Sequence, residues 1–361
     1  GLAAAATGGA IMNAPDLELL KTAVQANCDI ADARHARGMT MCNYLLAMRE
    51  LFRWERDIPL ASPLAQSELG AWIARREASW SELEDAEFLP LPLGGGCDPF
   101  DNAAINGMLG PSGLVYAGGI GRWGKPHFFL GDLLRRESRH GLDILVSERE
   151  HARDLFAPPA ALRGGMVFLR MDALRRWLWE KTEIWGVKQA DGALKAALDG
   201  YGFGEDAEAA LERMAAAESE TMILHEVGEG LAEPLLGPAW REMLLGLSDR
   251  RAELLARAVR DNLADCLSTL PALLARGTRP SIHFYFAGFE GLRRSLFPRL
   301  AAAYAAWRRT GDDADLRLAC RDGQGHWEDA ARRLLKAWQD DPATASGVFS
   351  AWVDQHGPLM L

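Results

Sequence analysis

The segment Glu218–Glu229, with the sequence ESETMILHEVGE, places ionisable side chains inside an apolar helical pattern. On a period of 3.6 residues, Glu218, His225 and Glu229 fall within about 40° of one another, so their side chains share one face. Met214 and Met222 lie on the same stripe, which indicates that the face is buried. Burial of charged groups is unfavourable by several kcal/mol unless a counter-charge or a metal compensates. The segment therefore predicts a core helix that also carries a candidate functional site.

The chain around this helix shows two patterns. After residue 190 apolar residues recur at helical spacing, and before residue 90 two further stretches do the same. Between them, short apolar runs separated by Gly, Pro and Asn predict strands of a small sheet. Residues 15–57 are predicted to form helices, one that Pro15 opens and another at Met39–Glu55. Further predicted helices are 64–85, one through Leu174–Trp185, and roughly 190–200, 206–233, 238–275, 280–308 and 326–340. The predicted strands are Leu114–Tyr116, His127–Leu130, Leu142–Val146 and Met166–Arg170.

These patterns predict a mainly α protein of the α+β class: a C-terminal helical bundle, with a small β-sheet inserted in the N-terminal half. We expect an N-terminal α+β domain at 12–190 and the bundle at 191–361. Residues 1–11 form an Ala/Gly-rich string just before Met12 and lack a basic flank, so we expect a cloning remnant and exclude them from the fold.

Composition excludes several partners. The formal net charge is −10, and nucleic-acid binding needs a basic surface. No apolar run approaches the roughly 18 residues of a membrane span, and no basic run suits an anionic membrane. The five cysteines are scattered and form no C-x-x-C pair, so neither a disulfide framework nor a thiolate zinc site is expected. We expect a cytoplasmic protein whose partner is a small-molecule substrate.

Two further predicted helices carry ionisable groups on apolar stripes. One bears Asp261 and Asp265, one turn apart, and another bears His283 and Glu290, two turns apart. Two buried carboxylates at i,i+4 repel each other unless a cation lies between them. A divalent metal (Fe, Mn or Zn), in a mononuclear or dinuclear site, would supply that cation.

The predicted metal ligands are Glu218, His225, Glu229, Asp261, Asp265, His283 and Glu290. The geometric test of this hypothesis is that His225, Asp261, Asp265 and His283 converge in one buried pocket.

Structural explanations exist for four of these residues. Glu218 and Glu229 fit the edge of an acidic helix, Asp261 fits an ion pair with Arg257, and His283 fits a core position among aromatic residues. A separate N-terminal group, Cys28, Asp32 and His35, shares one helical face and suits a ligand or nucleophile, or again an ion pair with a neighbouring arginine.

The string Leu224–Gly228 resembles the His-Asp motif of HD-domain phosphohydrolases, with Glu226 in place of the Asp. This resemblance implies an all-helical, metal-dependent hydrolase in which Asp261 or Asp265 serves as a downstream ligand. The upstream ligand of that family has no counterpart, because no histidine lies between His151 and His225.

The spacing Glu218-x6-His225 also resembles the first ligand helix of haem-oxygenase-like di-iron oxidases. That resemblance implies a helical bundle which activates dioxygen, completed here by the helices of Asp261/Asp265 and His283/Glu290. Not every ligand spacing of the family is matched.

The chain as a whole is similar to an uncharacterised bacterial family without an assigned activity. The similarity is carried by Asn27–Arg34, Met48–Glu50 with Arg53–Glu55, Gly124–Phe129 and His225–Glu229.

The sequence thus leaves two functional hypotheses. The first is a metal-dependent enzyme that oxidises a small molecule with oxygen or hydrolyses it with metal-activated water. Glu226 is its candidate general base, because it neighbours His225 but points about 100° away. The alternative is a non-catalytic helical scaffold or partner-binding protein, in which the acidic residues are structural and the 12 tryptophans form large contacts.

Overall fold

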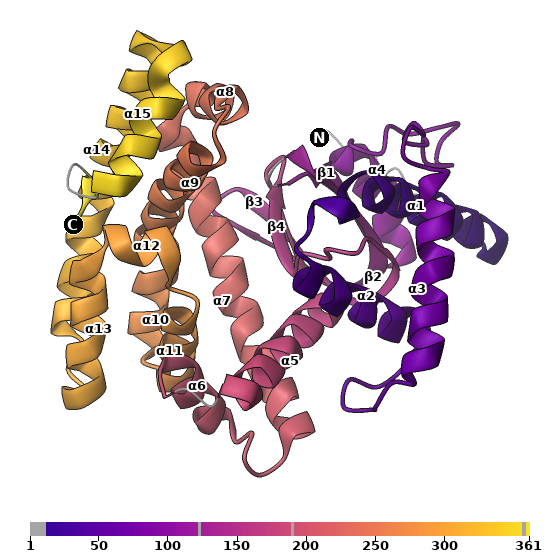
Figure 1. Cartoon of the computed structure of the whole chain (residues 1–361), viewed down its shortest axis with the longest axis horizontal. Coiled ribbons are helices and arrows are strands. Elements are labelled where there is room, and N and C mark those ends of the chain that lie inside the picture. The colour runs from indigo at the N-terminus through magenta and orange to yellow at the C-terminus, as the bar shows by residue number, and fades with distance from the viewer. Residues whose placement is uncertain (1–11, 122–123, 189–190, 356–358) are drawn as a thin grey trace, which may run out of the picture. The chain divides into compact units, whose positions relative to one another are not determined.

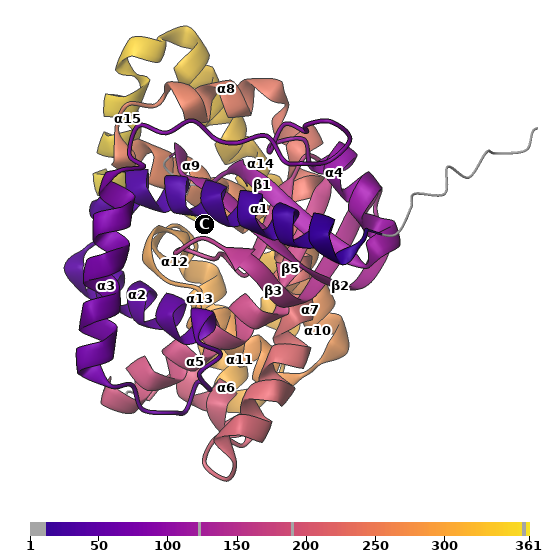
Figure 2. The same ribbon diagram turned by 90° about the vertical axis from the view of Figure 1, so that its right-hand side faces the viewer.

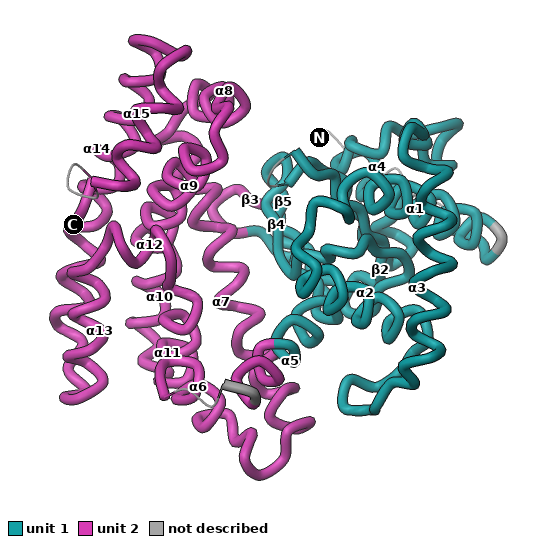
Figure 3. Tube along the Cα trace, in the orientation of Figure 1, with its two compact units in different colours: residues 1–138, 143–180 teal, residues 139–142, 181–361 magenta. Residues whose placement is uncertain are grey.

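The computed structural model describes residues 12–121, 124–188, 191–355 and 359–361, so the expected cloning remnant at 1–11 lies outside the described residues. The chain forms two compact units (Figure 3). Unit 1 comprises Gly1–Ser138 and Asp143–Glu180, and unit 2 comprises Arg139–Leu142 and Lys181–Leu361. The units therefore divide at Glu180/Lys181, whereas we placed the boundary at 190/191.

Unit 1 combines a sheet with helices that precede it in the chain (Figure 1). The described residues contain one five-stranded sheet in the order β1-β2-β3-β5-β4. The β1–β2 and β4–β5 pairs are antiparallel, while β3 and β5 run parallel. The elements are α1 (Ala14–His35), α2 (Met41–Glu55), α3 (Gln66–Ser81), α4 (Asn102–Leu109), β1 (Leu114–Ile120), β2 (Pro126–Arg139), β3 (Leu142–Arg153), β4 (Ala160–Arg163), β5 (Met166–Arg170) and the first half of α5 (Met171–Lys188).

Local chemistry explains the boundaries of these elements. The side chain of Asn13 accepts a hydrogen bond from Asp16 N at the start of α1, as an N-cap should. His140 and Gly141, between β2 and β3, both have positive φ, as the tight turn of a twisted hairpin requires.

Two apolar clusters make up much of the core of unit 1. Cys28 of α1 is buried with Tyr116 and Phe128 of the sheet, and α2 and α3 bury Phe52 and Trp72 together. Figure 2 shows α3 crossing the end of α1 at a steep angle.

The four predicted strands are present: β5 has the predicted bounds, and β1, β2 and β3 extend beyond their predicted ranges. The fifth, β4, was not predicted, because its four residues show no alternation and it exists by pairing with β5.

Unit 2 is helical throughout its described C-terminal part, so the predicted fold class, mainly α with a sheet in the N-terminal half, is confirmed. Its helices are the second half of α5, α6 (Ala193–Tyr201), α7 (Ala207–Leu236), α8 (Pro238–Gly246), α9 (Arg250–Ala264), a π-helical turn (Asp265–Thr269), α10 (Leu270–Arg276), α11 (Arg279–Ala287), α12 (Gly291–Leu296), α13 (Pro298–Thr310), α14 (Ala314–Asp340) and α15 (Pro342–Gln355). In the described part of the chain, no helix has the length and apolar character needed to cross a membrane.

Two predicted long helices were wrong as single elements. The predicted helix 238–275 is interrupted between α8 and α9 and widened by the π-helical turn. The predicted helix 280–308 consists of α11, α12 and α13, because the chain turns at Gly288, at Gly291 with φ +60°, and before Pro298. The helix α14 begins well before the predicted residue 326, and α15 was not predicted.

Candidate functional site

The helix α7 lies against α9 and the π-helical turn that follows it. At the contact, a Cβ on Gly228 would lie only 2.3 Å from the carbonyl oxygen of Ala264. The absence of a side chain at Gly228 therefore lets the two backbones approach closely. His225 and Glu229 flank Gly228 on α7, and Asp265 follows Ala264, so this approach brings ionisable residues that are far apart in the chain into one cluster.

The turn Asp265–Thr269 is π-helical and is followed by Pro271 in the first turn of α10. Proline has no N–H and cannot continue the preceding hydrogen-bond ladder, which favours a local widening of the helix. Single π-helical turns are frequent at functional sites. This one carries Asp265, which is 1% exposed.

Asp265 orients the imidazole of His225. The Nδ1 atom of His225 lies 2.8 Å from Oδ1 of Asp265, which also accepts a hydrogen bond from the Thr269 hydroxyl at 2.9 Å. The other oxygen, Oδ2, accepts from the Tyr285 hydroxyl at 2.9 Å and from the guanidinium of Arg293. With Nδ1 engaged in this way, His225 presents Nε2 away from Asp265.

Nε2 of His225 faces a second group of charges. It lies 3.5 Å from Oε1 of Glu229. Nη2 of Arg260 donates to that same Oε1 at 2.6 Å and to Oδ1 of Asp261 at 2.9 Å. The side chain of His225 is 22% exposed, so the cluster is partly open to solvent.

The electrostatics follow from these contacts. Burial would lower the pKa of His225, but the carboxylates of Asp265 and Glu229 outweigh it and hold that pKa well above its usual value. Burial would raise the pKa of Asp265, yet Arg293 and His225 hold it below the usual range. Burial acts in the same direction on Glu229, and Arg260 and His225 lower its pKa. At neutral pH the cluster is therefore an imidazolium between carboxylates, with two arginines.

The cluster can also offer three ligands to a metal ion. In the described part of the chain, one atom from each of His225, Glu229 and Asp261 lie within 4.8 Å of one another. A metal-ligating histidine characteristically donates its other ring N–H to a carboxylate, and Asp265 is so placed. One imidazole and two carboxylates suit Mn, Fe or Zn. The donor set fits a metal, provided that Arg260 gives up one of its contacts and that the imidazolium of His225 releases its Nε2 proton, because a metal binds neutral imidazole.

Asp261 and Asp265 are thus both buried, as predicted, and arginines lie beside both. The predicted Arg257 partner for Asp261 was wrong: Arg257 pairs with Glu253, one turn before it, and Asp261 with Arg260. Neither Arg260 nor Arg293 was singled out from the sequence. The sequence did carry a signal for such a partner: a buried pair of carboxylates needs a cation, which can be an arginine as well as a metal, and Arg260 directly precedes Asp261.

Glu218 lies outside this cluster. Its carboxylate accepts hydrogen bonds from the hydroxyl of Tyr201 and, at 2.7 Å, from that of Thr221. It is fully buried, and this burial raises its pKa. Glu226 is also buried, and its charge helps to raise the pKa of Arg260.

His283 and Glu290 do not join the cluster either. The predicted convergence of His225, Asp261, Asp265 and His283 in one buried pocket is therefore wrong: the first three lie in one cluster, and His283 lies elsewhere. His283 Nδ1 lies 2.8 Å from the Tyr304 hydroxyl. Because Tyr285 directs its hydroxyl to Asp265, His283, two residues earlier, points to another side of α11. Glu290 was predicted on the same helix as His283, which was wrong: α11 ends at Ala287, and Glu290 is an exposed N-cap of α12.

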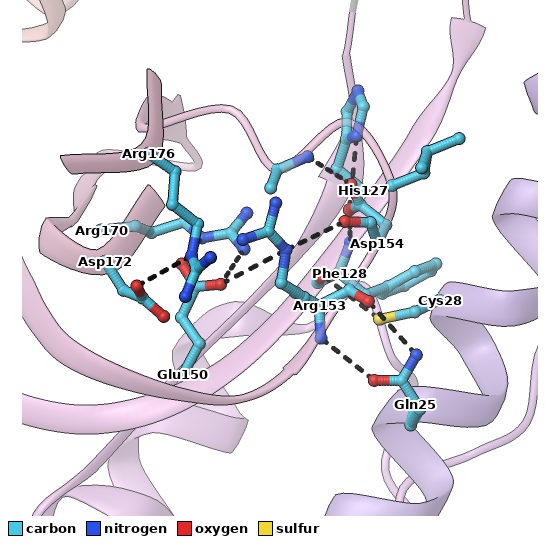
Figure 4. A network of polar contacts seen from close by, with 12 residues as sticks. Gln25, Cys28, His127, Phe128, Glu150, Arg153, Asp154, Arg170, Asp172 and Arg176 are labelled. Atoms are coloured by element: carbon cyan, nitrogen blue, oxygen red, sulfur yellow. Dashed lines mark hydrogen bonds and ion pairs between the residues drawn. The ribbon is translucent and has the colours of Figure 1, made fainter. Parts of the chain in front are cut away.

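Unit 1 contains a separate buried polar network (Figure 4). Glu150 accepts two hydrogen bonds from Arg170, both at 2.8 Å. The thiol of Cys28 donates to Phe128 O at 3.3 Å, and burial raises its pKa. Burial likewise raises the pKa of Asp32, which accepts from Leu155 N. Cys28 therefore binds α1 to β2, and Asp32 binds α1 to the segment that follows β3. This structural role of Asp32 rests on a backbone hydrogen bond rather than on the expected ion pair with a neighbouring arginine. His35, the third residue of the predicted group, is half-buried.

Two family models match the chain and together cover most of it. Both models belong to a family of unknown function (DUF6866): residues 19–170 match its N-terminal domain, and residues 175–355 match its C-terminal domain. No curated protein and no solved structure matches the chain. These findings lend no support to the resemblances to HD-domain phosphohydrolases and haem-oxygenase-like oxidases.

Proposed function

Because the chain belongs to this family of unknown function, we propose its function from the geometry of unit 2: a metal-dependent enzyme with a mononuclear site. His225 Nε2, Glu229 and Asp261 would bind one divalent ion, Fe, Mn or Zn. The observation that carries the proposal is the Asp265 carboxylate at 2.8 Å from His225 Nδ1, which fixes the ring with Nε2 toward the two other ligands.

Each residue of the cluster would have a distinct role. Asp265 holds the ring of His225, and Thr269, Tyr285 and Arg293 hold Asp265 in turn. Three protein ligands leave coordination positions open, as in catalytic sites, where a bound metal activates water or polarises a substrate oxygen. Glu226 is the candidate general base. A mononuclear site replaces the dinuclear alternative in this proposal, because Glu218 and His283 have other partners.

The proposal extends to the substrate and the setting. We expect a small molecule, because the candidate ligands are mostly buried, and the side chains of His225 and Glu229 are only 22% and 16% exposed. All five cysteines are free thiols, which is compatible with the expected cytoplasmic setting. The net charge of −10 is the reason that we expect no nucleic-acid partner.

A second candidate is a non-catalytic helical module. It is favoured by the charge balance of the cluster, since Arg260, Arg293 and the imidazolium of His225 already compensate Glu229, Asp261 and Asp265. Such a network would fix α7 against α9 without any ligand.

Arg260→Gln distinguishes the two candidates. The substitution removes the cation that competes with a metal. If the cluster is a metal site, we therefore expect the variant to bind metal at least as well as the wild type, and its Tm to rise on adding Mn, Fe or Zn. The module predicts a loss of about 3–5 kcal/mol of stability from unpaired buried carboxylates, which metal does not restore. Arg257→Gln is the matched control, because Arg257 lies on the same helix and pairs with Glu253.

Metal content per chain is measured on protein purified without chelator or nickel resin. We expect about one equivalent in the wild type and in Arg257→Gln, and less than about 0.1 in His225→Gln. Less than about 0.1 equivalent in both the wild type and Arg260→Gln, with no metal-dependent rise in Tm, refutes the metal site. With metal bound, phosphodiester hydrolysis and oxygen consumption then separate the two chemistries.

A further inference from the structure

A second feature of unit 2 is a cavity of about 190 Å³ between the start of α6 and the helices α11, α12 and α13. The metal-ligand candidates His225, Glu229 and Asp261 do not line it. Its walls combine aromatic rings with arginines, and small residues such as Ala301 and Ala305 of α13 leave the space open. The lining is therefore mixed, and binding sites for small molecules typically combine apolar surface with a few polar groups.

The floor of this cavity is aromatic. The rings of Phe286 and Tyr304 stack with centroids 3.9 Å apart and an interplanar angle of 14°. Phe289 meets Phe286 edge to face at 5.8 Å. The hydroxyl of Tyr304 is engaged by His283, which anchors the ring. These three side chains are buried, so the floor is an ordered apolar surface.

The rim of the cavity is basic. Arg294 of α12 and Arg308 of α13 both line it and are exposed. Within the described ranges neither forms an ion pair with a carboxylate, whereas the neighbouring Arg293 and Arg299 pair with Asp265 and Asp322. Arg308 lies 5.9 Å from the centroid of the Tyr304 ring. Two guanidinium groups are therefore available beside the aromatic floor.

We propose that this cavity binds an organic anion that carries an aromatic ring, with its carboxylate or phosphate between Arg294 and Arg308 and its ring on Phe286, Phe289 and Tyr304. Guanidinium groups bind carboxylates and phosphates through paired, charge-assisted hydrogen bonds. Aromatic floors bind rings through offset or edge-to-face contacts. This site is independent of the proposed metal centre, and its ligand is required neither to be a substrate nor to contact the metal.

Calorimetric titration of the full chain with benzoate and with phenyl phosphate tests the proposal. Each probe has a ring and one anionic group, and the comparison of the two distinguishes a carboxylate site from a phosphate site. We expect 1:1 binding of at least one probe, and roughly tenfold weaker binding of benzamide, which lacks the charge, and of cyclohexanecarboxylate, which lacks the aromatic ring.

Three variants locate the binding. The double substitution Arg294→Gln/Arg308→Gln is expected to weaken binding by roughly tenfold or more. Arg309→Gln is the matched control, because Arg309 is an exposed neighbour on α13 that does not line the cavity. Ala301→Leu fills the space while the arginines remain, so it is also expected to abolish binding; far-UV circular dichroism verifies that each variant is folded.

The proposal is overturned if neither probe binds at concentrations up to about 10 mM. It is equally overturned if the double variant and Ala301→Leu, both folded, bind the probe as the wild type does, because the anion then binds elsewhere.

Discussion

The contact between α7 and α9 depends on Gly228, and Gly228→Ala tests it directly. The added Cβ would lie 2.3 Å from Ala264 O and 2.8 Å from its carbonyl carbon. Both atoms belong to the backbone, so no side-chain rotation relieves the clash. To restore a contact of 3.0 Å, the two segments must separate by about 0.7 Å.

The magnitude follows from two opposing effects. Overpacking of a core is unfavourable by about 1–3 kcal/mol, and a rigid backbone on both sides favours the upper end. Replacing Gly by Ala inside a helix returns about 1 kcal/mol. We therefore expect Gly228→Ala to lower the free energy of unfolding by about 2 kcal/mol.

The matched control is Gly325→Ala, in the exposed part of α14, where an added Cβ meets nothing within 4 Å. It receives only the helix-propensity gain of about 0.5–1 kcal/mol. Urea denaturation followed by circular dichroism measures both variants. The separation also lengthens the 2.8 Å contact between His225 and Asp265, so NMR titration should find a lower pKa for His225 in Gly228→Ala. Equal stability of the two variants, with an unchanged pKa of His225, would refute the close-packing argument.

Three further predictions concern the charges of the two units. Asp265→Asn removes the carboxylate that holds the pKa of His225 above its usual value, so NMR titration of the imidazole should show this pKa falling, and an unchanged value would exclude Asp265 as the cause. Protonation of His225 stabilises the fold fully below the unfolded-state pKa of about 6.5, and this stabilisation is lost as the pH rises through the raised pKa of the folded state. Glu229 and Asp265 act in the opposite direction, because their stabilisation is lost as the pH falls through their lowered pKa values. The excess stability of wild type over His225→Gln in urea should accordingly shrink above neutrality, and a difference independent of pH would contradict this assignment. In unit 1, Glu150→Gln removes the buried carboxylate that pairs with Arg170 and Arg153, and it should lower the free energy of unfolding by about 3–5 kcal/mol. The control Glu148→Gln should lower it by at most about 1 kcal/mol, because the ion pair of Glu148 with Arg175 is more exposed. Similar losses for the two variants in denaturant unfolding would show that the Glu150 network contributes little.

Much of the fold was predictable because it depends on local patterns. Apolar spacing located α6 and α7, the helical character of most of unit 2 and four of the five strands. Errors arose where the outcome depended on distant partners. The short strand β4 exists only through β5, and the helix predicted at 280–308 is divided by glycine and proline turns whose conformation depends on the packing around them.

The candidate site shows the same division. The spacing of Glu218, His225 and Glu229 on one helix face was visible in the sequence, and so was the conflict between Asp261 and Asp265. The partners that resolve this conflict were not. Arg260 and Arg293 were not identified because an arginine can reach a carboxylate from several neighbouring helices, and side-chain direction is set by packing.

The sequence by itself thus determined the fold class and the presence of buried ionisable groups, because period and composition are local properties of the chain. Only the tertiary structure decided which of these groups meet. The close approach of Gly228 to Ala264 brings His225, Glu229, Asp261 and Asp265 together, while the end of α11 and the direction of Tyr285 leave His283 and Glu290 elsewhere. Contacts between residues far apart in the chain depend on how helices pack, and packing is a property of the whole unit.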